Sequence, residues 1–196
     1  MADLIIKPTS GNLLIKDDQD ATRMTVATST GNISLGTVTA GTIGTGVTKK
    51  IHAFSAYNSA DDCAIATGTW VEASATGTWV EQFDSLGHYA SGRFTPTVQG
   101  IYLIGYSAVF KNVDANEYGI SAIRKNGSYA AGDLHGWSEQ RNPGTGSNYD
   151  IGLSGSSIIQ LDTNDYVSLW CHHNEGGTQN LIENKTRFWG TYIGTV

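Results

Sequence analysis

The sequence predicts an all-β protein, and three observations carry that prediction. Charged residues make up only 15% of the chain, and glycine occurs 24 times, so the composition favours tightly turned β structure. No stretch repeats its apolar residues with the period of about 3.6 that a helix needs. Turn signals such as Lys125-Asn126-Gly127 separate runs of alternating apolar residues.

The most informative segment is 92–104, with the sequence GRFTPTVQGIYLI. Phe94 is followed by a turn that contains Pro96 and closes at Gly100. Aromatic and aliphatic residues alternate after Gly100. The segment therefore predicts a strand, a tight turn and a buried strand.

Further strands are expected along the whole chain. In the first part they are expected at 4–6, 12–16, 24–28 and 32–35. In the second part they are expected at 51–57, 101–110, 118–125, 149–161, 166–172 and 186–193. A short duplication, ATGTWVE at 66–72 and again at 75–81, is interpreted as a hairpin or edge insertion, or as a trace of gene slippage.

Residues 1–50 differ from the rest because they contain no Phe, Tyr or Trp. A segment without aromatic residues cannot easily bury a core of its own, so we expect its strands to be covered by other chains. The irregular glycines of 36–47 exclude a collagen triple helix and mark a boundary. The expected domains are a β-strand arm or stem at 1–50 and a globular domain at 51–196. The apolar residues expected to anchor the arm are Leu4, Ile5, Ile6, Leu13, Leu14 and Ile15.

Charge and sequence patterns restrict the partners. The net charge of −6 gives no general attraction to nucleic acid or to anionic membranes, and no apolar run has the length of a membrane helix. No secretory signal is visible at the N-terminus. The basic pair Arg124-Lys125 is interpreted as a strand end, and Cys63 and Cys171 as free thiols in preference to a disulfide.

Several segments, in order, resemble the C1q/TNF-like family. Phe54-Ser55-Ala56 resembles its opening strand, and 92–102 is similar to its Gly-x-Phe-x-x-Pro turn. Segment 161–169 is similar to Leu-x-x-Gly-Asp-x-Val-x-Leu, with Asn164 in place of the glycine, and 188–193 resembles the closing Phe-x-Gly strand. The resemblance covers about 51–196 and implies a jelly-roll β-sandwich that works as a homotrimer.

The arm is similar to the amino ends of bacteriophage virion proteins, with short Ile/Leu strands and Gly-Thr-rich turns. Both resemblances together imply a trimeric fibre or decoration protein, located on the virion after assembly in the host cytoplasm. The implied partners are sister chains and other capsid or tail proteins. The alternatives are a glycan- or receptor-binding tail fibre knob and a free C1q-like binding protein.

Two groups of aromatic residues are candidates for function. The first is expected to pack in the core or at the trimer interface, and consists of Tyr102, Tyr106, Trp170, Phe188 and Tyr192. The second lies in or near segments expected to be loops, where aromatic rings could stack on sugars, and consists of Trp70, Trp79, Trp137 and Tyr129.

No convergent catalytic set is visible, so the protein is not expected to be an enzyme. His172 and His173 are adjacent on an expected strand and should point to opposite faces, which argues against a shared metal ion. His135 is expected in a loop. No cofactor is expected, although the acidic segments 61–62 and 114–117 could offer oxygen ligands to Ca²⁺.

Overall fold

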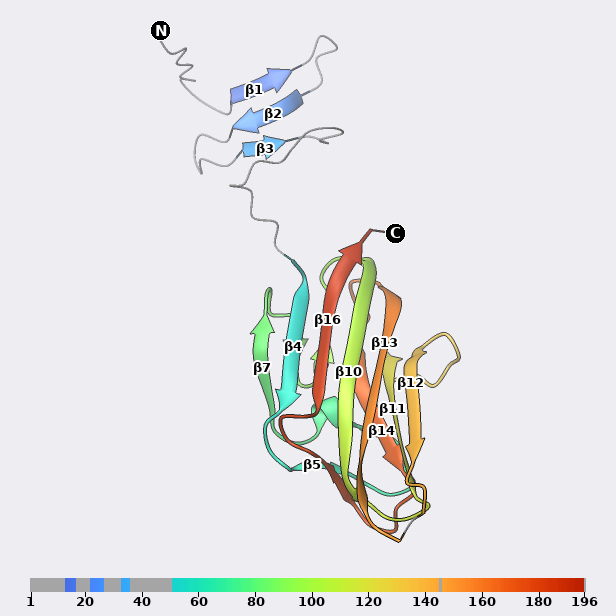
Figure 1. The fold of residues 1–196 in the computed structure, drawn as a ribbon. Coiled ribbons are helices and arrows are strands. Elements are labelled where there is room, and N and C mark those ends of the chain that lie inside the picture. Colours follow the sequence, from blue (N-terminus) through green and yellow to red (C-terminus); the bar gives the residue numbers. More distant parts are fainter. Residues whose placement is uncertain (1–12, 17–21, 27–32, 36–50, 145, 196) are drawn as a thin grey trace. The chain divides into compact units, whose positions relative to one another are not determined.

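The computed structural model describes residues 13–16, 22–26, 33–35, 51–144 and 146–195. The chain divides into two units, 1–48 and 49–196. The first unit contains a three-stranded antiparallel sheet with the order β1-β2-β3. Its strands are β1 (Leu13–Lys16), β2 (Thr22–Val26) and β3 (Ile33–Leu35) (Figure 1). The strand expected at 4–6, and with it the anchor residues Leu4, Ile5 and Ile6, lies outside the described residues.

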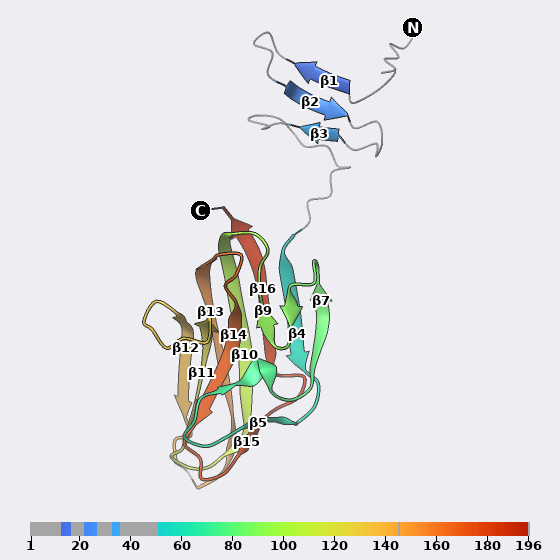
Figure 2. The same ribbon diagram turned by 180° about the vertical axis from the view of Figure 1, so that it is seen from behind.

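The second unit is a sandwich of two antiparallel sheets, seen from opposite sides in Figures 1 and 2. The seven-stranded sheet has the order β5-β15-β10-β16-β4-β7, and β13 pairs with β10. Its strands are β4 (Ala53–Asn58), β5 (Cys63–Ile65), β7 (Trp79–Asp84), β10 (Gly100–Val113), β13 (Tyr149–Leu161), β15 (Gln179–Leu181) and β16 (Arg187–Gly194).

The six-stranded sheet has the order β12-β11-β14-β9-β8, and β6 pairs with β14. Its strands are β6 (Val71–Glu72), β8 (Tyr89–Ala90), β9 (Arg93–Phe94), β11 (Tyr118–Lys125), β12 (Leu134–Arg141) and β14 (Val167–His173). A single 3₁₀ turn, η1 (Ala73–Ala75), follows β6 within the described residues. The all-β prediction is confirmed.

The core lies between the two sheets and follows the alternation of each strand. Along β10 the buried side chains include Tyr102, Ile104 and Phe110, while Ile101 and Leu103 on the other face are only partly covered. Tyr106 also links the two sheets, since its hydroxyl lies 2.8 Å from the Ser121 carbonyl oxygen and 2.7 Å from that of Gly136. Alternation of period two thus places one face of every long strand in the sandwich.

The structure narrows one sequence expectation and corrects another. Of the alternatives for the duplicated segments, the hairpin is excluded: the first copy ends in β6, beside Cys171, and the second begins the edge strand β7, beside Asn58 in the other sheet. Their strand pairing therefore follows distant partners and not each other. His135 does not lie in a loop but in strand β12, which pairs with β11.

The central turn behaves as expected, with one addition. β9 ends at Phe94 and β10 begins at Gly100, so the Pro96 segment is a turn between two strands. The two strands belong to different sheets, because β9 pairs with β8 and β14 while β10 pairs with β13, β15 and β16. The turn therefore crosses the sandwich. Cys63 and Cys171 are both buried free thiols, as the sequence suggested.

Candidate functional site

The outer face of the six-stranded sheet carries a cluster of aromatic rings around one arginine. Residues at even positions of β11 point away from the core, and Arg124 is the last of them. Trp170 projects beside it from β14, because Ala122 pairs with Trp170 and Arg124 with Ser168. The Asn126-Gly127 turn, with both residues at positive φ, then returns the chain and brings Tyr129 over the same spot.

Three rings surround the Arg124 guanidinium. Its Cζ lies 3.3 Å from the ring centroid of Tyr129, 4.2 Å from that of Trp170 and 4.5 Å from that of Trp70. Trp70, which precedes β6, also contacts Trp137 with ring centroids 5.5 Å apart. We call these five residues, Trp70, Arg124, Tyr129, Trp137 and Trp170, the arginine cage. A cation over aromatic faces is an attractive arrangement, and more so where water is excluded.

Arg124 is enclosed, with 1% of its surface exposed. Its Nε and Nη2 have no hydrogen-bond partner among the described residues. Burial lowers the pKa of Arg124, and its contact with the Tyr129 side chain opposes that shift. An arginine keeps its proton regardless, so the cage holds a positive charge without a matching carboxylate.

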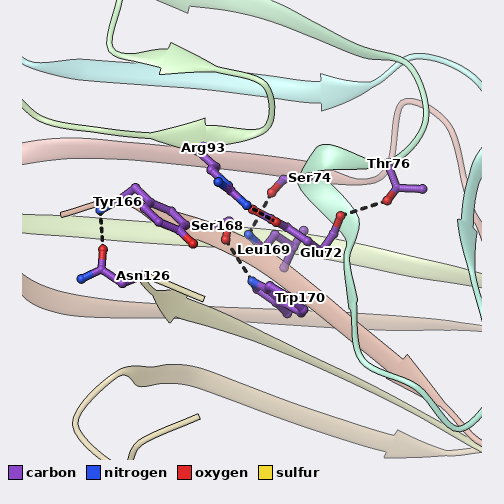
Figure 3. A network of polar contacts seen from close by, with 9 residues as sticks. All are labelled: Glu72, Ser74, Thr76, Arg93, Asn126, Tyr166, Ser168, Leu169 and Trp170. Atoms are coloured by element: carbon purple, nitrogen blue, oxygen red, sulfur yellow. Dashed lines mark hydrogen bonds and ion pairs between the residues drawn. The ribbon is translucent and has the colours of Figure 1, made fainter. Parts of the chain in front are cut away.

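Arg93, on the same face of the sandwich, shows the contrasting arrangement (Figure 3). Its Nε donates to Glu72 Oε1 at 2.7 Å and its Nη2 to Glu72 Oε2 at 2.8 Å, so one carboxylate occupies the Nε–Nη2 edge. The Arg93 guanidinium also lies 4.4 Å from the ring centroid of Tyr166. The hydrogen bond to Glu72 raises the pKa of Arg93. Both arginines therefore stack on aromatic rings, but only Arg93 has a bidentate anionic partner.

The rest of this network holds the neighbouring backbone. The Ser74 hydroxyl accepts a hydrogen bond from the Leu169 amide at 3.1 Å, which ties η1 to β14. Trp170 Nε1 donates to the Ser168 hydroxyl at 2.9 Å, which fixes the ring that faces Arg124. The Asn126 side chain accepts from the Tyr166 amide at 2.9 Å and anchors the turn before Tyr129 (Figure 3).

The structure brings together three of the four residues expected to contact a ligand. Trp70, Tyr129 and Trp137 all belong to the cage, and Tyr129 and Trp137 are 54% and 49% exposed. Trp79 does not join them. Its ring packs against the core, and its Nε1 lies 3.0 Å from the Ala73 carbonyl oxygen and 2.9 Å from that of Thr76. These residues were expected in or near loops: Trp79 is the first residue of β7, and Trp137 lies within β12.

The aromatic residues expected in the core or at an interface lie on two different faces of the sheets. Tyr102, Tyr106 and Phe188 are buried between the sheets, and Tyr192 packs against that core. Trp170 points the other way and belongs to the cage. Leu13, Leu14 and Ile15 lie on β1 of the first unit.

The outer face of the seven-stranded sheet is apolar and hollowed. Register places Phe83, Ser55, Trp189 and Gly105 in one row across β7, β4, β16 and β10. The Trp189 indole lies against Gly105, where an added Cβ would overlap the ring. A hollow of about 600 Å³ beside it is lined by Ile51, Ala53, Phe54, Ser55, Phe83, Ser85, Trp189, Gly190 and Thr191.

Large apolar side chains are exposed in and beside the hollow. Ile51 is 58% exposed, Phe83 53%, Ile158 65% and Ile193 53%. Large apolar surfaces are unusual on soluble monomers and commonly mark contact with another protein.

The adjacent histidines and the acidic segment 61–62 make contacts within the protein. His172 and His173 point to opposite faces as expected, since His173 is buried in the core and His172 stacks near Tyr118. Asp61 pairs with Lys111, and Asp62 accepts hydrogen bonds from Thr78. The described part of the chain contains no group of three or more His, Cys, Asp or Glu residues that could hold a metal ion. Nor, among those residues, does any helix have the length and apolar character needed to cross a membrane.

Sequence reasoning missed Arg124, which it took for a strand end. The available signal was its even position on a strand whose partner carries Trp170, followed by a turn and an aromatic residue. The ion pair of Arg93 with Glu72 and the stacking of His52 on His88, with centroids 5.3 Å apart, were also missed.

No family model and no curated protein matches the chain. Solved structures do match it. Eiger TNF from S. frugiperda is 9% identical with a TM-score of 0.56, covering 76% of this chain and 96% of its own. The globular domain of the zebrafish complement 1qA protein is 15% identical with a TM-score of 0.50, covering 74% and 99%. Murine APRIL at pH 8.5 is 9% identical with a TM-score of 0.51, covering 74% and 100%. The chain therefore has a C1q/TNF-like fold.

Proposed function

We propose that the protein is a homotrimeric structural protein of a bacteriophage particle. Residues 1–50 form the arm that anchors it to other capsid or tail proteins, and 51–196 form a C1q-like knob that faces outward. The knob presents a surface and carries out no catalysis. The location is the virion, after assembly in the host cytoplasm.

The apolar outer face of the seven-stranded sheet carries this proposal. Ile51 and Phe83 border a hollow floored by Trp189, and a face of this kind is stabilised when a second copy covers it. The C1q/TNF-like fold agrees with the trimer that the sequence resemblance implied. The proposed location on a particle is supported by the arm, because residues 1–50 contain no aromatic residue with which to build a core of their own.

Sedimentation of the full chain tests the trimer. The expected mass is about three times the chain mass of 20.9 kDa. Phe83→Glu places a charge in the apolar face at an exposed position and should shift the protein to monomers, because burying an unpaired carboxylate is costly. Val98→Glu, at a 38% exposed site in the β9–β10 turn, is the matched control and should remain trimeric. A monomeric wild-type chain at micromolar concentration would overturn the proposal.

Mass spectrometry of purified particles tests the location separately. Peptides of this chain should co-purify with particles at a fixed ratio to the capsid protein. A trimer that is absent from particles would overturn the virion role and leave the free C1q-like binding protein in its place. A cryo-EM map of the particle would then distinguish a head fibre from a tail fibre.

A second candidate function, attachment to a host glycan, is favoured by the cage. Trp70, Tyr129 and Trp137 come together from three separate segments, and two of them are about half exposed. Aromatic rings grouped on a surface offer a platform for the apolar face of a sugar.

A further inference from the structure

The second candidate function can be given a specific ligand class, because the two arginines on this face differ in one respect. Arg93 presents its Nε–Nη2 edge to the Glu72 carboxylate, with both donor distances below 3 Å. Arg124 has the same two nitrogens unpaired, although it is the more deeply buried of the two. A buried guanidinium is costly to leave without a hydrogen-bonding anion.

We propose that the arginine cage binds acidic carbohydrate, with a sugar carboxylate on the Nε–Nη2 edge of Arg124 and the sugar ring against Trp70 and Trp137. This inference rests on the glycan-attachment function and names its ligand. The guanidinium edge and a carboxylate match in a bidentate geometry, which a neutral sugar cannot provide. The neighbouring rings supply a stacking surface for the sugar ring, which a small carboxylate without a ring would leave uncovered.

Tyr129 controls access to Arg124. Its ring covers the guanidinium at 3.3 Å, yet it is 54% exposed on the turn between β11 and β12. The start of this turn is tied to β14's side of the sheet by the Asn126 amide, which donates to the Tyr166 carbonyl oxygen, whereas the segment 128–133 has local backbone hydrogen bonds, from Ser128 to Lys125 and from Asp133 to Ala130. Binding of a carboxylate at the Nε–Nη2 edge requires the Tyr129 ring to move away from the guanidinium, while Trp170 is held by its bond to Ser168.

Two pockets of the second unit fit this chemistry less well than the cage. The hollow on the seven-stranded sheet is lined almost wholly by apolar groups. A smaller cavity of about 290 Å³ is lined by Glu81, whose negative charge would repel an anion. The cage is the place where an unmatched positive charge and sugar-sized aromatic surfaces coincide.

The test is calorimetric titration of the full-length protein with two matched pairs of sugars. One pair is tetragalacturonate and its methyl ester, and the other is sialyllactose and lactose. At least one acidic member should bind about tenfold or more tightly than its neutral partner, in line with a charge-assisted hydrogen bond. No binding by either acid at millimolar concentration, or equal binding of acid and neutral sugar, would overturn the proposal.

Three variants assign the binding to the cage. Arg124→Gln should remove the preference for the acid, and Trp137→Ala, at an exposed site, should weaken the acidic sugar about tenfold while the fold is retained. Arg93→Gln is the matched control and should leave binding unchanged, because Arg93 is already paired with Glu72. If Arg124→Gln does not fold, Trp137→Ala alone decides: unchanged affinity in that variant would overturn the assignment.

Failure of this inference can be separated from failure of the wider function. If an Arg124→Gln particle loses acid binding yet adsorbs normally to its host, the acidic-sugar site is supported and the glycan-attachment function is refuted. If the wild-type protein binds only neutral glycan, through Trp137, the glycan-attachment function is supported and the proposed role of Arg124 is refuted.

Discussion

The outer faces of the two sheets use aromatic residues in opposite ways. On the seven-stranded sheet, Trp189 lies against a glycine and leaves an apolar hollow. On the six-stranded sheet, Trp70 and Trp170 stack on a buried cation. The first face is stabilised by any complementary apolar surface, whereas the second offers directional donors to one kind of group. The difference assigns assembly to one face and recognition to the other within the proposed function.

The duplicated segment provides the strongest test of this contrast, because it places identical residues on both sides. Trp79 packs against the core and its Nε1 is bound to two carbonyl oxygens, whereas Trp70 contacts Arg124 and the neighbouring rings on the outer face. Trp79→Ala should reduce the free energy of unfolding by about 3 kcal/mol, and Trp70→Ala by about 1 kcal/mol. Urea denaturation of both variants measures the two values. Equal losses would show that the two copies have the same role.

A glycine pair sharpens the description of the apolar face. Gly105→Val should cost about 2 kcal/mol, because a Cβ there overlaps the Trp189 indole and forces the ring off the sheet. Gly152→Val, on the adjacent strand β13 with open space around its Cβ position, is the control and should change stability by less than about 1 kcal/mol. The same denaturation experiment compares them. If Gly105→Val were as mild as the control, Trp189 would not be held over the glycine.

The smallest effect is expected from pH, and it concerns the core behind the cage. His173 Nε2 donates to the Ile65 carbonyl oxygen at 2.7 Å and its Nδ1 accepts from the Glu175 amide, so the ring is neutral. Burial lowers the pKa of His173 below its ordinary value of 6.5. Below that value the unfolded chain takes up a proton that the folded chain does not. Stability should therefore fall as the pH drops below 6.5.

Thermal unfolding between about pH 7.5 and about pH 5.5 checks this prediction. The range ends there because the pKa of Glu175 is raised by burial, which acts in the opposite direction at lower pH. His173→Gln should show a smaller fall than the wild type. An unfolding temperature that rises toward pH 5.5 would contradict the assignment. The pKa of His52, His135 and His172 is also lowered, chiefly by burial, and adds to the fall in the same direction.

Local pattern was sufficient for two long strands. β11 and β13 have the bounds that the sequence suggested, since both lie between clear turn signals, whereas β10 extends three residues beyond its expected end at 110. β12 was not foreseen, because its sequence LHGWSEQR contains glycine and few apolar residues. It is a strand because β11 offers it an edge with which to pair, and that edge is a property of the tertiary structure.

The candidate site shows the same limit. Trp70, Tyr129 and Trp137 could be selected from the sequence as exposed aromatic residues, but their meeting could not. Trp79 has the same local sequence as Trp70, but the strands that follow or contain them pair in different sheets, so no local rule could separate the two.

The sequence by itself determined the all-β class, the resemblance to a C1q/TNF-like sandwich and the face on which each long strand places its side chains. Those properties depend on composition, turn residues and a period of two, all of which are local. Only the tertiary structure decided that a strand-end arginine is enclosed by three rings and lacks a carboxylate. Two of the three rings, Trp70 and Trp170, come from segments more than 40 residues from Arg124 in the chain, and no local pattern brings them there.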